Sequence, residues 1–286
     1  MSKLRTIEIG ALNIAMHKPH SPERYVSLFK DAKRLKRLIK LGSLHGAMLG
    51  SLSVPKELTR NEVVTGEIYR FVNIDGSLPW FNLETSDAAT EDDLESVSIP
   101  PNLLPNLQRI EFVFLPYTHQ LWLVTQDRKD RMGITTAAKF FQLLFDVLVI
   151  EHKYPPIEVT PLPEEDSLEE MLSLKHLEKI VIELKRPNAD DGGDLEKKLQ
   201  KKMEKMNIRK MQTTYTTDSG ATISPDEETK EFAKIASKNG NVSIVGRNAE
   251  GLPIRESTQA KPMIMSQHVN QEIENSMDVL KRVAKE

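Results

Sequence analysis

Five lysines lie close together between residues 195 and 206, and the apolar residues among them recur at the spacing of one helix face. The lysines are Lys197, Lys198, Lys201, Lys202 and Lys205. The apolar stripe, at spacings of four, four and three, consists of Leu195, Leu199, Met203 and Met206. This pattern predicts an amphipathic helix whose exposed face is strongly basic.

A face of this kind could bind a polyanion. Several lysines within about 15 Å of helix length create a local positive field that phosphate groups would feel. Because no aromatic side chains are interleaved with the lysines, the contacts would go to the phosphate backbone rather than to bases. Two other interpretations stay open at this point: an ordinary solvated helix face, and a surface for a protein partner.

A second basic segment lies near the start of the chain. Ser21, Pro22 and Glu23 have the residue types of a helix start, and Gly42 suits a helix end. The sequence therefore predicts a helix from about residue 22 to 40. Its cations of interest are Lys33, Arg34, Lys36 and Arg37. We expect this segment to add further contacts to nucleic acid that do not depend on base sequence.

The sequence Glu183-Leu184-Lys185 offers a different chemistry. It closes an apolar stretch that reads as a strand, so the acid and the lysine should point to one face. The arrangement resembles half of the motif of PD-(D/E)xK nucleases, in which the acid holds a divalent metal and the lysine polarises water or phosphate. That motif also needs an aspartate on a preceding strand, whereas Asp166 stands at a predicted helix start. A metal-dependent nuclease is thus an alternative, and solvent-facing strand positions are the simpler interpretation.

Other site patterns are weak or missing. His17 and His20 lie three residues apart without a supporting acid, so no metal site is expected there. The chain contains no cysteine, which excludes disulfides and thiolate metal ligands. The sequence also lacks a phosphate-binding P-loop, a dinucleotide fingerprint, a nucleophile elbow and a zinc-protease helix motif. We therefore expect no cofactor, no resident metal and no catalysis.

Length and composition set broader limits. The chain has 286 residues, 28% of them charged, and a formal net charge of −3. No apolar run approaches the roughly 18 residues that cross a membrane, and no signal peptide is evident, so we expect a cytoplasmic protein with no membrane contact. Because the net charge is slightly negative, any binding of nucleic acid must depend on local basic patches.

The order of predicted strands and helices favours an α+β protein of two lobes, each with a mixed, mostly antiparallel sheet and helices packed on one face. A proline-rich stretch near residues 155–166 marks the expected boundary. The N-terminal lobe would cover residues 1–163 and include an irregular acidic insertion at 76–106, with Trp80 and Phe81 pinning one end into the core. Residues 164–286 would form a C-terminal β-α-β-α-β-β-α lobe.

Several stretches are similar to an uncharacterised bacterial family, a domain of unknown function met in mobile elements and phage-defence loci. The similar stretches are GALNIAMHKPHSPERY, VTGEIYRF, PWFNLET and LKRPNADDGGDLE. More loosely, the second half resembles the RexA exclusion protein of phage lambda in the order and size of its elements. These resemblances imply a phage-defence context, a homodimer that binds DNA without strict sequence preference, and a separate effector protein.

Together, the basic segments and the resemblance lead to one expectation. The chain should be a non-catalytic nucleic-acid-binding sensor or accessory subunit in bacterial anti-phage defence. A metal-dependent nuclease using Glu183 and Lys185 is the enzymatic alternative, and a protein-interaction scaffold is the third. The sequence does not distinguish DNA from RNA.

Overall fold

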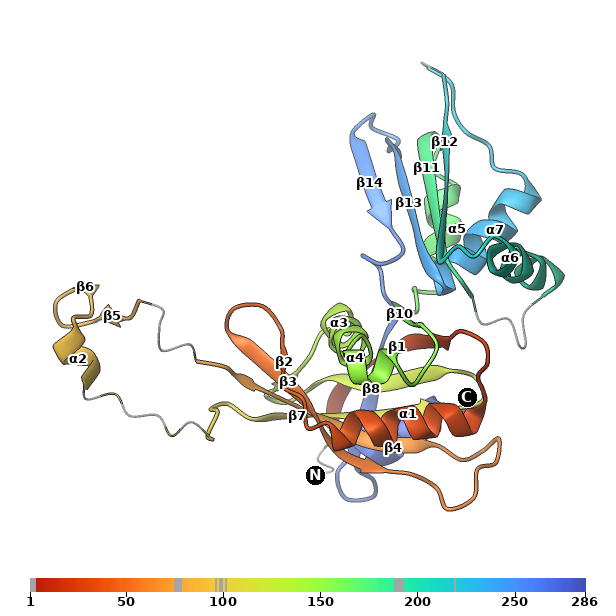
Figure 1. The fold of residues 1–286 in the computed structure, drawn as a ribbon. Helices are drawn as coiled ribbons and strands as arrows, with labels where there is room; N and C mark the ends of the chain where they lie inside the picture. Colours follow the sequence, from red (N-terminus) through yellow and green to blue (C-terminus); the bar gives the residue numbers. More distant parts are fainter. Residues whose placement is uncertain are drawn as a thin grey trace.

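The computed structural model describes residues 4–74, 79–95, 97, 100, 102–187, 193–218 and 220–286. These residues form an α+β protein, as the sequence predicts, with two main sheets (Figure 1). Parts of the expected insertion at 76–106 lie outside the described residues. Among the described helices, none is long and apolar enough to span a membrane.

The first sheet has nine strands, and all of its pairings are antiparallel. Along the sheet the order is β10-β1-β8-β7-β4-β3-β2, with β15 also pairing β1 and β9 pairing β8. The strands are β1 (Leu4–Met16), β2 (Ile39–Lys40), β3 (His45–Ser53), β4 (Val64–Val72), β7 (Gln108–Leu115), β8 (Gln120–Asp127), β9 (Asp130–Arg131), β10 (Ile157–Pro161) and β15 (Ile264–Asn270).

An aromatic core fills one face of this sheet. Helices α1 (Pro22–Arg34) and α3 (Ile134–Phe145) cover it, and the short α4 (Leu148–Glu151) follows α3. Phe29 of α1 lies against the rings of Phe112, Phe114, Phe141 and Phe145, with centroids 4.8–6.0 Å apart. All five side chains are buried, so α1 is held by tight ring packing.

The opposite face of the first sheet is also covered. Helix α8 (Ser276–Val283) packs there through Val279, Leu280 and Val283 against Ile7, Val113 and neighbouring apolar side chains. Along β7, Val113 points to this face while Phe112 and Phe114 point to the aromatic core, as strand alternation requires. The expectation that helices cover one face only therefore does not hold for this sheet.

The second sheet has four strands in the order β12-β11-β13-β14. Three helices pack with it around a smaller core in which Ile180, Ile182 and Leu184 are fully buried. The elements of this unit are α5 (Ser167–Leu172), β11 (His176–Lys185), α6 (Asp194–Lys205), β12 (Lys210–Thr216), α7 (Glu227–Lys238), β13 (Gly240–Arg247) and β14 (Pro253–Ser257).

The chain leaves the first sheet after β10 and returns to it at β15. A bridge between Pro163 and Pro262 marks the two crossing points, and β15 then pairs with residues Leu4 to Gly10 of β1. The last strand and helix thus belong to the first sheet, whereas the sequence assigns them to a C-terminal lobe of residues 164–286. The expected boundary differs because pairing between β1 and β15 leaves no local pattern in the sequence.

Two predictions about local structure also need correction. Helix α1 ends at Arg34 rather than near residue 40, because Lys36 takes a positive φ of 46° and Ile39 pairs with Ala47 as a strand. In the acidic insertion, Trp80 is half-buried and Phe81 is 64% exposed. They do not anchor the insertion in the core; the segment extends away from both sheets (Figure 1).

Candidate nucleic-acid interface

Helix α6 forms where the sequence predicts it, and its apolar side faces the second core. Met203 and Gln200 are buried, and Leu195 and Leu199 are half-buried against that core. Acidic residues stand in its first turn and Lys202 and Lys205 in its last, which suits the helix dipole at both ends. The helix is therefore positioned by packing on one side, and its other side is left for solvent.

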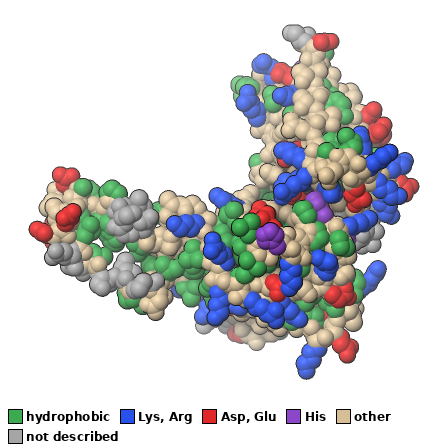
Figure 2. Space-filling model, viewed as in Figure 1, with side chains coloured by type: hydrophobic (Ala, Val, Ile, Leu, Met, Phe, Trp, Pro, Cys, Tyr) green, Lys and Arg blue, Asp and Glu red, His purple; other side chains and the backbone are tan. Residues whose placement is uncertain are grey.

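The basic face of α6 is open. Lys197, Lys198, Lys201, Lys202 and Lys205 are all exposed, and no ion pair joins any of them to another residue in the described ranges. They span eight residue steps, or about 12 Å of helix, and basic side chains gather over this element in Figure 2. We call these five residues the lysine face. Five positive charges within this length form a local patch that attracts phosphate groups.

Contacts at both ends hold the lysine face in place. Ile208 follows the C-terminal end of the helix, and its carbonyl accepts a hydrogen bond from the Arg186 guanidinium at 2.7 Å. Near its start, Asn239 donates to Glu196 at 3.2 Å, and burial raises the pKa of that carboxyl group. Met206, expected in the apolar stripe, instead follows the last turn and is 57% exposed, so the stripe ends at Met203.

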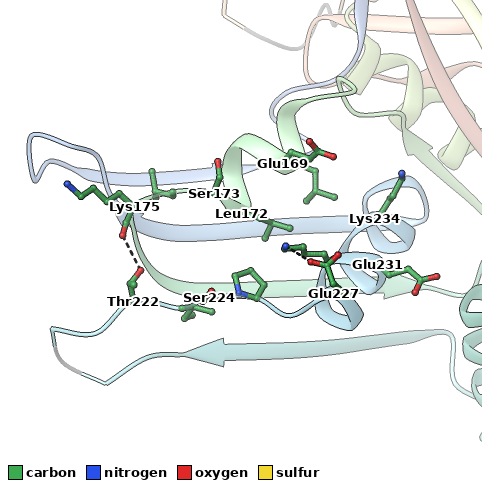
Figure 3. A pocket seen from close by; sticks show the side chains of 14 residues that line it. Glu169, Leu172, Ser173, Lys175, Thr222, Ser224, Glu227, Glu231 and Lys234 are labelled. Carbon is green, nitrogen blue, oxygen red and sulfur yellow. Dashed lines mark hydrogen bonds and ion pairs between the residues drawn. The ribbon is translucent and has the colours of Figure 1, made fainter.

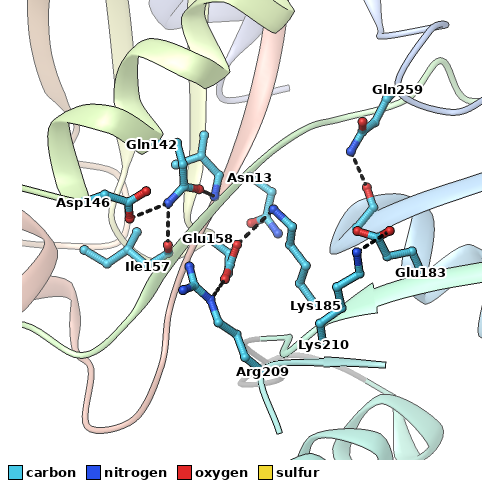
Figure 4. A network of polar contacts seen from close by, with 12 residues as sticks. Asn13, Gln142, Asp146, Ile157, Glu158, Glu183, Lys185, Arg209, Lys210 and Gln259 are labelled. Carbon is cyan, nitrogen blue, oxygen red and sulfur yellow. Dashed lines mark hydrogen bonds and ion pairs between the residues drawn. The ribbon is translucent and has the colours of Figure 1, made fainter. Parts of the chain in front are cut away.

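A buried carboxylate joins this unit to the first sheet. Glu158 of β10 is 4% exposed and accepts from Arg209 at 2.5 Å and from Lys185 at 3.0 Å (Figure 4). Burial by itself would raise the pKa of Glu158, but the hydrogen bond from Arg209 and the charge of Lys185 outweigh it and lower the pKa. Glu158 is therefore ionised at neutral pH and compensated by two cations.

His17 lies at the same junction, just after β1. It is 5% exposed, and its burial lowers the pKa to about 4, helped by the charge of Arg186 and opposed by Glu158. The imidazole is consequently neutral at pH 7. His17 thus contributes to the junction as a buried uncharged ring, and the structure does not bring His20 and His17 together with an acid cluster among the residues it describes.

Glu183 and Lys185 point to one side of β11, as expected, but each side chain is engaged. Glu183 pairs with Lys210 at 2.7 Å, and Lys185 pairs with Glu158. Both side chains are 25% exposed and lie on the face opposite the buried Ile182 and Leu184, so they are partly exposed positions that also form ion pairs. The residues opposite Glu183 on the two neighbouring strands are Gln212 and Asn241, not aspartates, and Asp166 precedes helix α5.

The cations at the end of α1 have a different environment from those of α6. Lys33 is half-buried and donates to the carbonyl of Leu49 at 3.3 Å. Arg34 pairs with Asp31 at 3.3 Å, and Asp31 also binds Lys153 and Tyr154. Lys36 and Arg37 are exposed but lie beyond the helix. Only two of the four expected cations here are thus exposed without a described partner.

The structure does not join the two basic segments into one surface. Helix α1 packs on the first sheet with β3 and α4, whereas α6 packs with α7 on the second. In Figure 1, α1 runs along the lower part of the molecule and α6 lies on the outside of the upper sheet. They form two separate basic patches.

Sequence reasoning missed the residues that position α6, namely Glu158, Arg209 and Arg186. A signal for Glu158 was present, because it is the one acid inside the short apolar strand Ile157–Pro161. An acid flanked by buried side chains needs a cationic partner. The identity of that partner could not be read locally, since Lys185 and Arg209 lie on other elements.

The structure also contains a depression of about 940 Å³ between α5, α7 and residues 222–225 (Figure 3). Its charged lining is balanced, with three glutamates and three lysines: Glu169, Glu227, Glu231, Lys175, Lys230 and Lys234. Lys230 is already paired with Glu227 at 2.7 Å. A site with such balanced charge does not select anions, so the lysine face is the stronger candidate for phosphate.

One family model matches almost the whole chain, including both sheets. No curated protein matches the chain. A family model described as a domain of unknown function, DUF4747, matches residues 5–285, which includes both sheets and the returning strand β15. The chain therefore belongs to the DUF4747 family.

Proposed function

We propose that this protein binds nucleic acid through the lysine face of α6, without catalysis of its own. The observation that carries the proposal is the set of five exposed lysines on one helix, with no ion pair to any residue that the structure describes. Cations that are already neutralised by carboxylates would gain little from phosphate, whereas unpaired ones gain the full attraction.

Binding of this kind reads charge rather than sequence. Lysine ammonium groups contact phosphate oxygens and carry no information about bases. Each phosphate that is neutralised releases counterions, so affinity falls steeply as salt rises. The slightly negative net charge of the whole chain adds no attraction at long range, and binding therefore depends on this one local patch.

The proposed role is that of a sensor or accessory subunit in bacterial anti-phage defence, acting in the cytoplasm. Its support is the similarity to a family met near defence genes and the looser likeness to the RexA exclusion protein. On this proposal the protein forms a homodimer, its lysine face binds the phosphate backbone of DNA or RNA, and a separate effector protein carries out the response.

A metal-dependent nuclease that uses Glu183 and Lys185 has less support. Glu183 and Lys185 each form an ion pair, and one of these pairs ties the two sheets together. No observation favours a second use of these side chains in phosphate cleavage.

The test is a fluorescence anisotropy titration of labelled duplex DNA and of RNA at several salt concentrations. A plot of log affinity against log salt should have a slope of about −3 to −4.5, since each contacted phosphate adds about 0.9 for duplex DNA. Replacing all five lysines with glutamine should bring the slope close to zero.

A matched control separates the lysine face from general charge. The control replaces five other exposed lysines with glutamine: Lys56, Lys129, Lys175, Lys179 and Lys285. It changes net charge equally and should leave both affinity and slope near the wild-type values. No detectable binding by the wild type at low salt, or equal losses in the two variants, would contradict the proposal.

A further inference from the structure

The described residues 79–95, here called the acidic arm, form a small unit of their own. Strands β5 (Phe81–Asn82) and β6 (Asp87–Ala88) pair only with each other, and helix α2 (Glu91–Glu95) follows. Ala89 donates to the carbonyl of Trp80 at 2.7 Å, and Thr90 and Asp93 cap the helix reciprocally. The arm is thus internally ordered although it extends away from both sheets (Figure 1).

The arm concentrates the negative charge of the chain. No lysine or arginine occurs between Arg70 and Arg109, while this stretch contains seven acids. Because the whole chain has a net charge of −3 and this stretch contributes −7, the rest of the chain is at +4. Glu84, Asp87, Glu91 and Asp92 are all exposed on the described arm.

The arm also exposes large apolar side chains. Phe81 is 64% exposed and Leu83 is 85% exposed. A hairpin that holds two such side chains in water, beside a row of acids, has the composition of a contact surface with a basic, partly apolar counterpart. The lysine face has this composition, since five exposed lysines are followed by Met206, which is 57% exposed.

We propose that the lysine face of α6 binds the acidic arm of a second copy of this chain. The arm and α6 lie on opposite sides of the molecule in Figure 1, which favours a contact with the α6 of a second copy over a contact within one chain. Two copies related by a two-fold axis can exchange arms, which gives two identical contacts and a closed dimer. The charges of the two surfaces are complementary, which favours this pairing over contacts between like surfaces.

This inference concerns the regulation of the site in the proposed function, and it rests on the same lysines. In the dimer the arm occupies the lysine face, so nucleic acid must displace it to bind. Its test, however, measures self-association in the absence of nucleic acid. The two proposals can therefore fail separately.

The experiment is sedimentation velocity on nuclease-treated protein at low salt, with two charge-reversal variants. The arm variant replaces Glu84, Asp87, Glu91 and Asp92 with lysine, and the face variant replaces Lys197, Lys198, Lys201 and Lys202 with glutamate. We expect a wild-type dimer that dissociates as salt rises. Each variant alone should be monomeric, with a dissociation constant raised about tenfold or more.

Mixing the variants is the decisive step. An arm of reversed charge meets a face of reversed charge in the mixture, and the other two surfaces are native, so a heterodimer should form. Circular dichroism checks that both variants are folded, which is expected because all eight positions are exposed. In a separate variant, the double change Phe81→Ser and Leu83→Ser should weaken the dimer without altering its charge.

The control reverses four exposed glutamates outside the arm: Glu57, Glu62, Glu250 and Glu272. This variant should remain a dimer. A monomeric wild type, an arm variant that stays dimeric, or two variants that do not associate on mixing would each overturn the inference. If the dimer behaves as expected and nucleic acid is not bound, the inference stands and the proposed function fails.

Discussion

Helices α1 and α6 have similar lengths and are both rich in basic residues, but their side chains have different environments. Phe29 of α1 is inserted among four other phenylalanines, and nearby cations bind a backbone carbonyl or Asp31. Helix α6 rests on a smaller core through Met203 and half-buried leucines, and its lysines have no ion partner among the described residues. A run of basic residues therefore indicates a binding face only when the fold leaves the charges unpaired.

The largest effect is expected from removing the side chain that anchors each helix in its core. Phe29→Ala should lower the free energy of unfolding by about 3–5 kcal/mol, because it leaves a cavity among buried rings. Leu199→Ala should cost only about 1 kcal/mol, since that side chain is half-buried. Urea unfolding measures both. Equal losses would mean that α6 is as deeply anchored as α1.

The next effect concerns the junction that holds α6 and β12 to the first sheet. Glu158→Ala should destabilise the protein by about 2 kcal/mol, since the change removes the hydrogen bonds that the buried carboxylate accepts from Arg209 and Lys185, while the 59% exposed Arg209 side chain stays accessible to water. Glu57→Ala, which changes an exposed acid without a described ion pair, is the control and should change stability little. If the two variants unfold at the same urea concentration, the junction carries no stability.

Acid should weaken the same junction through His17. Its folded-state pKa of about 4 lies below the ordinary value of 6.5, so the unfolded chain binds more protons between these pH values. Stability from this group is complete above pH 6.5 and is lost as pH falls toward 4; at pH 5 the loss is about 2 kcal/mol. His17→Gln should remove this part of the pH dependence. Unfolding curves at pH 7 and pH 5 that shift equally in both proteins would disprove it.

The smallest expected effect concerns the basic side chains of the two segments. Replacing Lys201 and Lys202 with glutamine should weaken nucleic-acid binding about tenfold, because both cations are unpaired. The same change of charge at Lys33 and Arg34 should weaken it less than about threefold, since these two already have partners. Anisotropy titrations at one low salt concentration compare the pairs, and a larger loss at Lys33 and Arg34 would reverse the ranking.

Local patterns in the sequence predicted most of the helices and strands. The α+β class, the strand ending at Lys185 and the helix spanning Lys197 to Lys205 agree with the structure. Apolar residues recur in these elements with a strong period, and such periodicity is the most reliable local signal for a helix or a strand. The lysine face followed from the same periodicity, because the apolar stripe of α6 fixes which side is exposed.

The features that sequence did not predict are those set by distant partners. The apolar residues Leu38 and Ile39 continue the spacing of α1, yet Ile39 pairs with Ala47 because β3 offers a sheet edge. Phe81 reads as a core residue, but its segment extends away from the core. Strand β15 has a weak local pattern, and its backbone hydrogen bonds to residues Leu4 to Gly10 of β1 stabilise it as a strand. In each case tertiary contacts override local preference.

The pairing of β1 with β15 has a consequence for synthesis of the protein on the ribosome. Strand β1 emerges early, but residues 264–270, which complete its pairing, follow only after the whole second sheet has been made. Until then part of β1 is an unpaired edge, and the apolar face that α8 covers is open to water. Nascent chains with such edges are prone to aggregate and to need chaperones. A shortened protein that stops at residue 163 would keep this exposed edge permanently.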